Sequence, residues 1–231
     1  MKILFLAPRL PLPADTGAKI RTFNLLRHIA AVNQVTFLSF WFGEDKKIIQ
    51  KLEAMGVEVH LVKARDRYNF TSLFNRNPLS IVKYSSKEME NTLHELLVNK
   101  KFDLVYFDHL HMGQYRLFVN GVPCMLDEHN VESVILNRCA EIEKSLAKRL
   151  IFKSQAKKMK RFEARLVGKF SRCLTVSEND KQKLLELSHN TAKVEVIPNG
   201  VDTEYFSFRD SPLKMPWYLR DQWIGCLTVT R

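Results

Sequence analysis

No stretch of the sequence approaches the eighteen or so consecutive apolar residues that a membrane-spanning helix requires. The four cysteines lie far apart and form no CxxC pair, which disfavours a zinc site or a disulfide framework and suits reduced thiols in a cytosolic protein. The short apolar run after Lys2 is too brief for a signal peptide, and prolines interrupt it at once. Together these absences predict a cytoplasmic protein, at most peripheral on the inner face of a membrane.

What the sequence does contain is an alternation of short apolar runs with helical patterns. Such runs indicate strands buried in a parallel sheet, and the helical patterns between them indicate crossover helices. We therefore predict an α/β fold with a doubly wound, mostly parallel sheet of about seven strands in the order 3-2-1-4-5-6-7. The domain is expected to span residues 1–206, and residues 207–231, which show no periodicity, form an irregular tail. The predicted strands are 3–7, 34–40, 57–62, 104–107, 123–126, 173–176 and 194–197.

Polar segments follow four of these strands, at residues 15–17, 108–111, 127–133 and 177–180. Ligands of open parallel sheets bind at the carboxyl ends of the strands, so the four segments are expected to meet at one ligand site. In the first segment, Asp15 or Thr16 can cap the following helix. Gly17 either lets a ligand approach the helix N-terminus closely or merely makes a tight turn, because one glycine satisfies no phosphate-binding motif.

Histidines in two of the segments are the strongest candidates for chemistry. His129 stands between a strand and a helix beside two acids, where it can bind or protonate a substrate; the alternative is a capping or core histidine. The run of Asp108, His109 and His111 could bind a metal ion, but a loop that lines the cleft is the favoured interpretation, since the loop offers no matching third ligand.

The net charge of +11 is concentrated in one part of the chain. A proline-free helical pattern runs from residue 131 to about 170, and residues 144–172 hold eleven Lys/Arg and the single acid Glu163. Such a run is either a solvated helix face or a surface for anionic lipid or nucleic acid. No helix-turn-helix, RRM or zinc signature is visible, so nucleic acid is an unlikely partner and an anionic membrane surface is preferred.

Several segments together resemble the retaining glycosyltransferases of the GT-B fold, family 4 (group 1 glycosyltransferases). The matching pieces are residues 11–21, 127–133, 161–163, 176–180 and 198–202, and the resemblance covers roughly residues 1–206. The last piece, Pro-Asn-Gly-Val-Asp, is the most specific, because in that family it lies at the passage into the second domain. The resemblance implies a Rossmann-like N-terminal domain that binds the acceptor, with the nucleotide sugar held by a C-terminal domain.

The resemblance also implies roles for individual residues. Gly17 and Thr16 would face the donor diphosphate, and His129 would contact the transferred sugar as the catalytic residue. No metal ion or other cofactor is expected beside the nucleotide-sugar co-substrate, and the acceptor would be a lipid-linked sugar or polysaccharide of the cell envelope or an exopolysaccharide. The acceptor side of the cleft would be formed by Asp15, Lys19, Arg21, Asp108, His109, Asp127, Asn130, Ser177 and Glu178.

The chain departs from the family pattern after residue 206, where the donor domain should begin. Only 25 residues follow, and none resembles that domain. We therefore expect a glycosyltransferase-like N-terminal half, inactive as an isolated chain. The alternatives are an acceptor or membrane-docking subunit whose donor domain is a separate polypeptide, and a basic nucleic-acid-binding α/β domain.

Overall fold

The computed structural model describes residues 1–64, 73, 75–201 and 203. The chain divides into two units, 1–199 and 200–231, and the fold described below is that of the first unit. The predicted tail at 207–231 lies outside the described residues.

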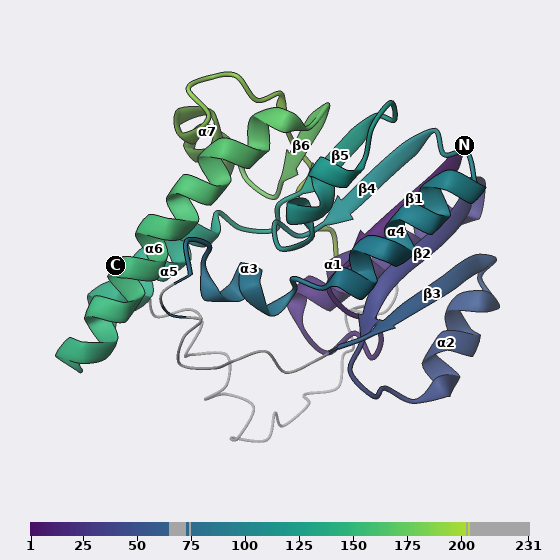
Figure 1. The fold of residues 1–231 in the computed structure, drawn as a ribbon, viewed down its shortest axis with the longest axis horizontal. Helices are drawn as coiled ribbons and strands as arrows, with labels where there is room; N and C mark the ends of the chain where they lie inside the picture. Colours follow the sequence, from purple (N-terminus) through teal and green to yellow (C-terminus); the bar gives the residue numbers. More distant parts are fainter. Residues whose placement is uncertain (65–72, 74, 202, 204–231) are drawn as a thin grey trace. The chain divides into compact units, whose positions relative to one another are not determined.

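The centre of the first unit is a seven-stranded sheet, and every neighbouring pair of strands is parallel (Figure 1). The order β3-β2-β1-β4-β5-β6-β7 confirms the predicted fold class and strand order. The sequence therefore specified both the parallel pairing and the crossover pattern. The strands are β1 (Lys2–Ala7), β2 (Gln34–Trp41), β3 (Val57–Lys63), β4 (Leu104–Asp108), β5 (Cys124–Asp127), β6 (Arg172–Thr175) and β7 (Val194–Val196).

Helices cover both faces of the sheet, and the central strands are therefore buried on both sides. In β1, Leu4 and Leu6 belong to one hydrophobic core, whereas Ile3 and Phe5 belong to the other. This alternation follows from the two-residue repeat of a strand. The helical segments are α1 (Gly17–Val32), α2 (Lys46–Glu53), α3 (Leu79–Lys83), α4 (Lys87–Asn99), η2 (Met112–Phe118), α5 (Glu132–Ile142), α6 (Leu146–Leu166), η3 (Val167–Lys169) and α7 (Glu178–Leu187).

The region predicted as one long helix from 131 to about 170 contains a break. Glu143 has extended backbone angles, and α5 and α6 pack against each other on either side of it. The side chain of Arg149 reaches back to the Glu143 carbonyl and donates to it from Nε and Nη2, at 3.1 and 2.9 Å. The Arg149 side chain thus supplies hydrogen bonds to the Glu143 carbonyl, which has lost its helical partner, so the chain can turn without a proline or glycine.

The helix caps position the segments expected at the site. Thr16 caps α1 by accepting a hydrogen bond from the Lys19 amide, and Ser177 caps α7 by accepting one from the Asp180 amide. No helix in the described part of the chain is long and apolar enough to cross a membrane.

Candidate active site

The site lies at the carboxyl edge of the sheet, where β4 and β5 end side by side. Asp108, the last residue of β4, pairs in register with Asp127, the last residue of β5. Both carboxylates are almost completely buried, at 1% and 0% exposure. Two buried acids at adjacent strand ends need compensating charge and hydrogen bonds, and α1 and the loop after β5 supply them.

Asp127 is held by a buried ion pair with Arg21 of α1. Arg21 donates to the two carboxylate oxygens from Nε and Nη2, each at 2.9 Å, and the hydroxyl of Tyr106 donates to Oδ2 at 2.9 Å. The remaining nitrogen of Arg21, Nη1, donates to the Ile197 carbonyl and to Oδ1 of Asn199, both at 2.9 Å. Arg21 thus connects α1 to β5 and to the segment after β7, and these contacts hold the parts of the site together.

His129 lies between the two acids. Its Nε2 is 2.9 Å from Oδ1 of Asp108 and 3.4 Å from Oδ2 of Asp127, while the Thr22 hydroxyl donates to the other oxygen of Asp108 at 2.9 Å. The ring is 5% exposed, and its Nδ1 has no hydrogen-bond partner among the described residues. One ring nitrogen is therefore fixed by the protein, and the other is buried without a hydrogen-bond partner among the described residues.

The two carboxylates decide the protonation state of His129. Burial lowers the pKa of an imidazole, but the charge and hydrogen bonds of Asp108 and Asp127 outweigh burial and raise the pKa of His129 to about 9. Burial likewise raises the pKa of Asp127, but hydrogen bonds from His129 and Arg21 outweigh it and lower that pKa to about 2. At neutral pH the site holds an imidazolium whose free N–H is a charged donor.

The loop after β4 packs two more histidines beside His129. The ring of His109 lies over that of His129, with 4.1 Å between centroids, and His111 lies 5.6 Å beyond His109. His109 has a φ of 72°, in the left-handed region that residues other than glycine rarely adopt. Desolvation and the neighbouring His129 charge lower the pKa of His109 to about 3, and desolvation with Lys83 lowers that of His111 to about 4. Both rings are neutral at pH 7.

A cavity of about 180 Å³ opens between the start of α1 and this loop. Its walls combine apolar surface with basic and imidazole groups, which suits an anionic or hydroxyl-rich ligand. The predicted site residues among its lining are Thr16, Lys19, Asp108 and His109, and the sequence analysis did not assign Arg9 or Tyr84, which also line it.

The other predicted site residues lie apart from the buried cluster. Gly17 begins α1 at an exposed position, and a Cβ added to it would meet nothing within 4 Å. Asp15 is exposed and pairs with Lys19 at 2.9 Å. Asn130 is exposed, directly after His129. The Ser177 side chain bonds Asp180 in the first turn of α7, and Glu178 pairs with Lys181 at 3.8 Å.

Sequence reasoning missed three residues that complete the cluster. Thr22 lies nearly two turns after the α1 cap, close enough to the end of β4 to donate to Asp108, and helical periodicity could in principle have placed it on this face. Tyr106 lies in the apolar run of β4 and belongs to the hydrophobic core, so nothing in its local pattern marks its hydroxyl as a partner of Asp127. Asn199 lies 178 residues from the Arg21 that it contacts, and no local pattern predicts that pairing.

A second buried acid pair supports the helices behind the site. Glu128 and Glu163 are 1% and 0% exposed, and Oε1 of Glu163 accepts the Ser133 amide of α5 at 3.1 Å. Burial and the nearby charge of Glu163 raise the pKa of Glu128 well above its usual range, and burial also raises the pKa of Glu163. Glu163 thereby connects the first turn of α5 to α6.

Comparison with known families decides the identity of this arrangement. The model of glycosyltransferase family 4 matches residues 16–205, which is most of the chain and contains the whole buried cluster. The chain belongs to this family. Comparison with curated protein sequences gives no match.

Two solved structures share the fold of this family-4 chain. The crystal structure of Anabaena Alr3699/HepE in complex with UDP-glucose aligns over 96% of this chain and 50% of its own, with a TM-score of 0.54 and 16% identity. Arabidopsis thaliana UGT89C1 complexed with UDP-L-rhamnose aligns over 99% of this chain and 62% of its own, with a TM-score of 0.52 and 8% identity. The chain thus spans between half and two thirds of the length of these proteins.

Proposed function

We propose that this chain forms the acceptor side of a retaining glycosyltransferase that moves a hexosyl group from a nucleotide sugar to a lipid-linked or polysaccharide acceptor. Membership of family 4 supports the reaction class. Two structures of the same fold are described with UDP-glucose and UDP-L-rhamnose, which favours a nucleotide sugar as the donor. Synthesis of the cell envelope or an exopolysaccharide is the setting that such acceptors imply.

The observation that carries the proposal is the state of His129. Its Nε2 is held by two buried carboxylates, and its Nδ1 is unpaired among the described residues. We propose that this charged N–H donates to a hydroxyl or ring oxygen of a transferred sugar that reaches it, which would stabilise charge that develops there. Because the raised pKa keeps the proton on the ring, His129 acts as a hydrogen-bond donor and not as a general base.

The first turn of α1 is proposed to face the donor diphosphate. Gly17 and Thr16 lie at an exposed helix N-terminus, where amide hydrogens and the helix dipole favour an anion. The space around the Gly17 Cα is open, so a diphosphate can approach the backbone there. Lys19 adds positive charge one turn on, although Asp15 partly neutralises it.

Donor binding is expected to need a second domain, supplied in the same chain or by a separate donor-domain subunit. A few amides at one helix end are far short of a nucleotide pocket, and transfer requires donor and acceptor to be held together. We expect this chain alone to show no turnover and at most weak binding of UDP- and GDP-sugars by calorimetry. Micromolar binding by the chain alone would contradict this proposal. The transfer step itself is proposed to use no metal ion, so that EDTA leaves turnover intact.

The test of His129 is carried out with the donor domain present. His129→Ala should reduce turnover by about 100-fold or more, the usual effect of losing a hydrogen-bond donor to the transition state. His94→Ala, at an exposed position on α4, is the matched control and should leave turnover unchanged. Circular dichroism establishes that the variant is folded. Wild-type turnover by folded His129→Ala would refute the role of this residue.

Docking to an anionic membrane surface is the second part of the proposal. Around the start of α6, Ile142, Leu146 and Leu150 are 71%, 72% and 67% exposed. The only acid of residues 144–172, Glu163, is buried, so the charged groups on the surface of this stretch are all basic. Exposed leucines flanked by lysines are typical of a helix that lies in a membrane interface, and each cation near anionic lipid contributes about 1 kcal/mol.

Vesicle flotation tests this docking. The chain should float with vesicles that contain acidic phospholipid and not with neutral ones, and Leu146→Ser with Leu150→Ser should abolish flotation. Val98→Ser, which changes an equally exposed apolar residue on α4, is the control and should have no effect. Binding to duplex DNA at matched salt without binding to acidic vesicles would instead favour a nucleic-acid partner.

A further inference from the structure

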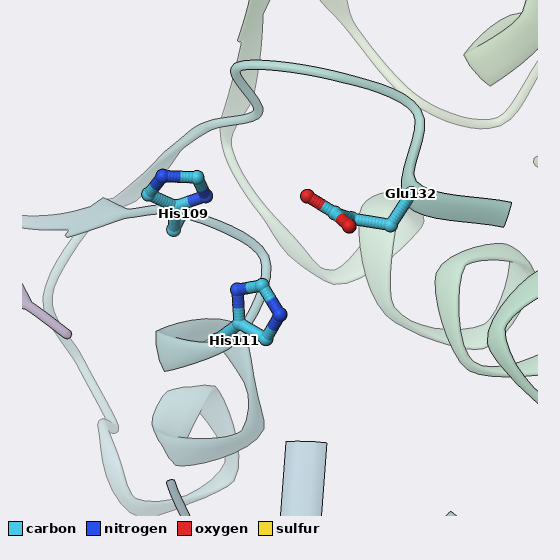
Figure 2. Close-up of side chains that lie close together, drawn as sticks. All are labelled: His109, His111 and Glu132. Atoms are coloured by element: carbon cyan, nitrogen blue, oxygen red, sulfur yellow. The ribbon is translucent and has the colours of Figure 1, made fainter. Parts of the chain in front are cut away.

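Three side chains, from the loop after β4 and the start of α5, gather beside the candidate active site, and no hydrogen-bond partner is found for them among the described residues. His109 and His111 follow β4, and Glu132 is the first residue of α5. Their imidazole and carboxylate groups point toward a common space, with one ligand atom of each residue within 4.8 Å of the others (Figure 2). From the sequence, a metal site at the two histidines is disfavoured because no third ligand is visible. The fold places Glu132 beside them as a third candidate ligand.

We propose that His109, His111 and Glu132 form a binding site for a divalent transition-metal ion of the Zn²⁺ type. Two ligand atoms on one tetrahedral Zn²⁺ ion lie about 3.4 Å apart, so side-chain rotations that close the present spacing would bring these three onto a single ion. Two imidazoles and one carboxylate suit zinc and its neighbours, whereas Mg²⁺ and Ca²⁺ prefer sites built from oxygen alone. A three-ligand set leaves a coordination position for water.

The ligand atoms are available in the folded protein. Among the described residues, no hydrogen-bond partner contacts the ring nitrogens of His109 or His111 or the carboxylate oxygens of Glu132. All three side chains are only partly buried, so an ion can enter from solvent. Metal ligands must be free and unprotonated to bind, and unpartnered neutral imidazoles satisfy that requirement.

The backbone holds the two histidines in place before any ion arrives. The His109 amide donates to the Asp127 carbonyl, and its own carbonyl accepts from Met112, both at 3.0 Å. Gln114 donates to the His111 carbonyl at 2.8 Å. These bonds fix His109 at a positive φ, an unfavourable conformation that persists only where the surroundings impose it. Such strain is common where a ligand group must point in one direction.

This inference does not rest on the proposed sugar transfer, because metal binding is measured without any sugar. The site also differs from the group of Asp108, Asp127 and His129, whose carboxylate oxygens and His129 Nε2 are already engaged with Thr22, Arg21 and one another. The ion is not assigned to the transfer step. It would bridge the loop after β4 to the start of α5.

The experiment uses the untagged full chain, stripped with EDTA and then titrated with Zn²⁺ by calorimetry and with Co²⁺ by visible absorption. We expect one ion of each per chain, with Co²⁺ bands typical of nitrogen and oxygen ligands. His111→Ala and Glu132→Gln should each weaken metal binding by more than about tenfold. Loss of a residue that only hydrogen-bonds to a metal ligand already weakens binding by at least about that much, and loss of a ligand should cost more. His94→Ala removes an exposed histidine on α4 and should leave binding unchanged.

Circular dichroism of the metal-free variants checks that they remain folded, and Glu132→Gln is nearly isosteric, so it preserves the packing of α5. The inference is overturned if the wild-type chain binds no Zn²⁺ or Co²⁺. It is also overturned if both ions bind with unchanged affinity in His111→Ala and Glu132→Gln, or if His94→Ala loses the binding.

Discussion

The buried position of His129 predicts a loss of stability at alkaline pH. The folded pKa of about 9 lies above the ordinary value of 6.5, so the folded state binds this proton more tightly than the unfolded state. The stabilisation is fully present below about pH 6.5 and is lost as pH rises through about 9. A difference of about 2.5 pKa units corresponds to about 3 kcal/mol, taken as an upper estimate of the free energy involved.

Urea denaturation at a series of pH values from about 6 to 10 measures this effect in the wild-type chain and in His129→Asn. The free energy of unfolding of the wild type should fall with pH. The variant starts lower at pH 6, because its two carboxylates have lost a buried cation, and it should show a flatter profile. The difference between the two proteins therefore shrinks as pH rises. Parallel profiles across the whole range would refute the assignment of this pH dependence to His129.

Two further predictions concern other buried contacts. Asp127→Asn leaves the buried guanidinium of Arg21 without its counter-ion and should lower the free energy of unfolding by about 3–5 kcal/mol, measured by urea denaturation; a change below 1 kcal/mol would mean that the ion pair is not buried as described. Gly113→Ala places a Cβ 2.6 Å from Cδ2 of the buried Leu166 and should destabilise by about 1–3 kcal/mol. Gly17→Ala meets open space and is the matched control; its melting temperature should equal or slightly exceed that of the wild type, whereas a loss like that of Gly113→Ala would contradict the packing at both sites.

The sequence determined the sheet and the edge at which the site lies. Short apolar runs and the helical patterns between them are local signals, and the right-handed crossover rule converts them into one strand order. The caps Thr16 and Ser177 are also set by local sequence, because a capping side chain accepts a hydrogen bond from an amide two or three residues away. The break at Glu143 was not predicted, since a side chain six residues further along the chain compensates it and no proline or glycine marks it.

The tertiary structure decided which partners surround the candidate site residues. Arg21 and Asp127 are 106 residues apart, so only the fold could show that Arg21 is engaged inside the protein. The nearness of Glu132 to His109 and His111 likewise depends on where α5 begins relative to the end of β4. The charge of His129 is the clearest case. Its sequence neighbours do not fix its pKa, because that pKa is the balance between burial and two carboxylates that two adjacent parallel strands bring to the same ring.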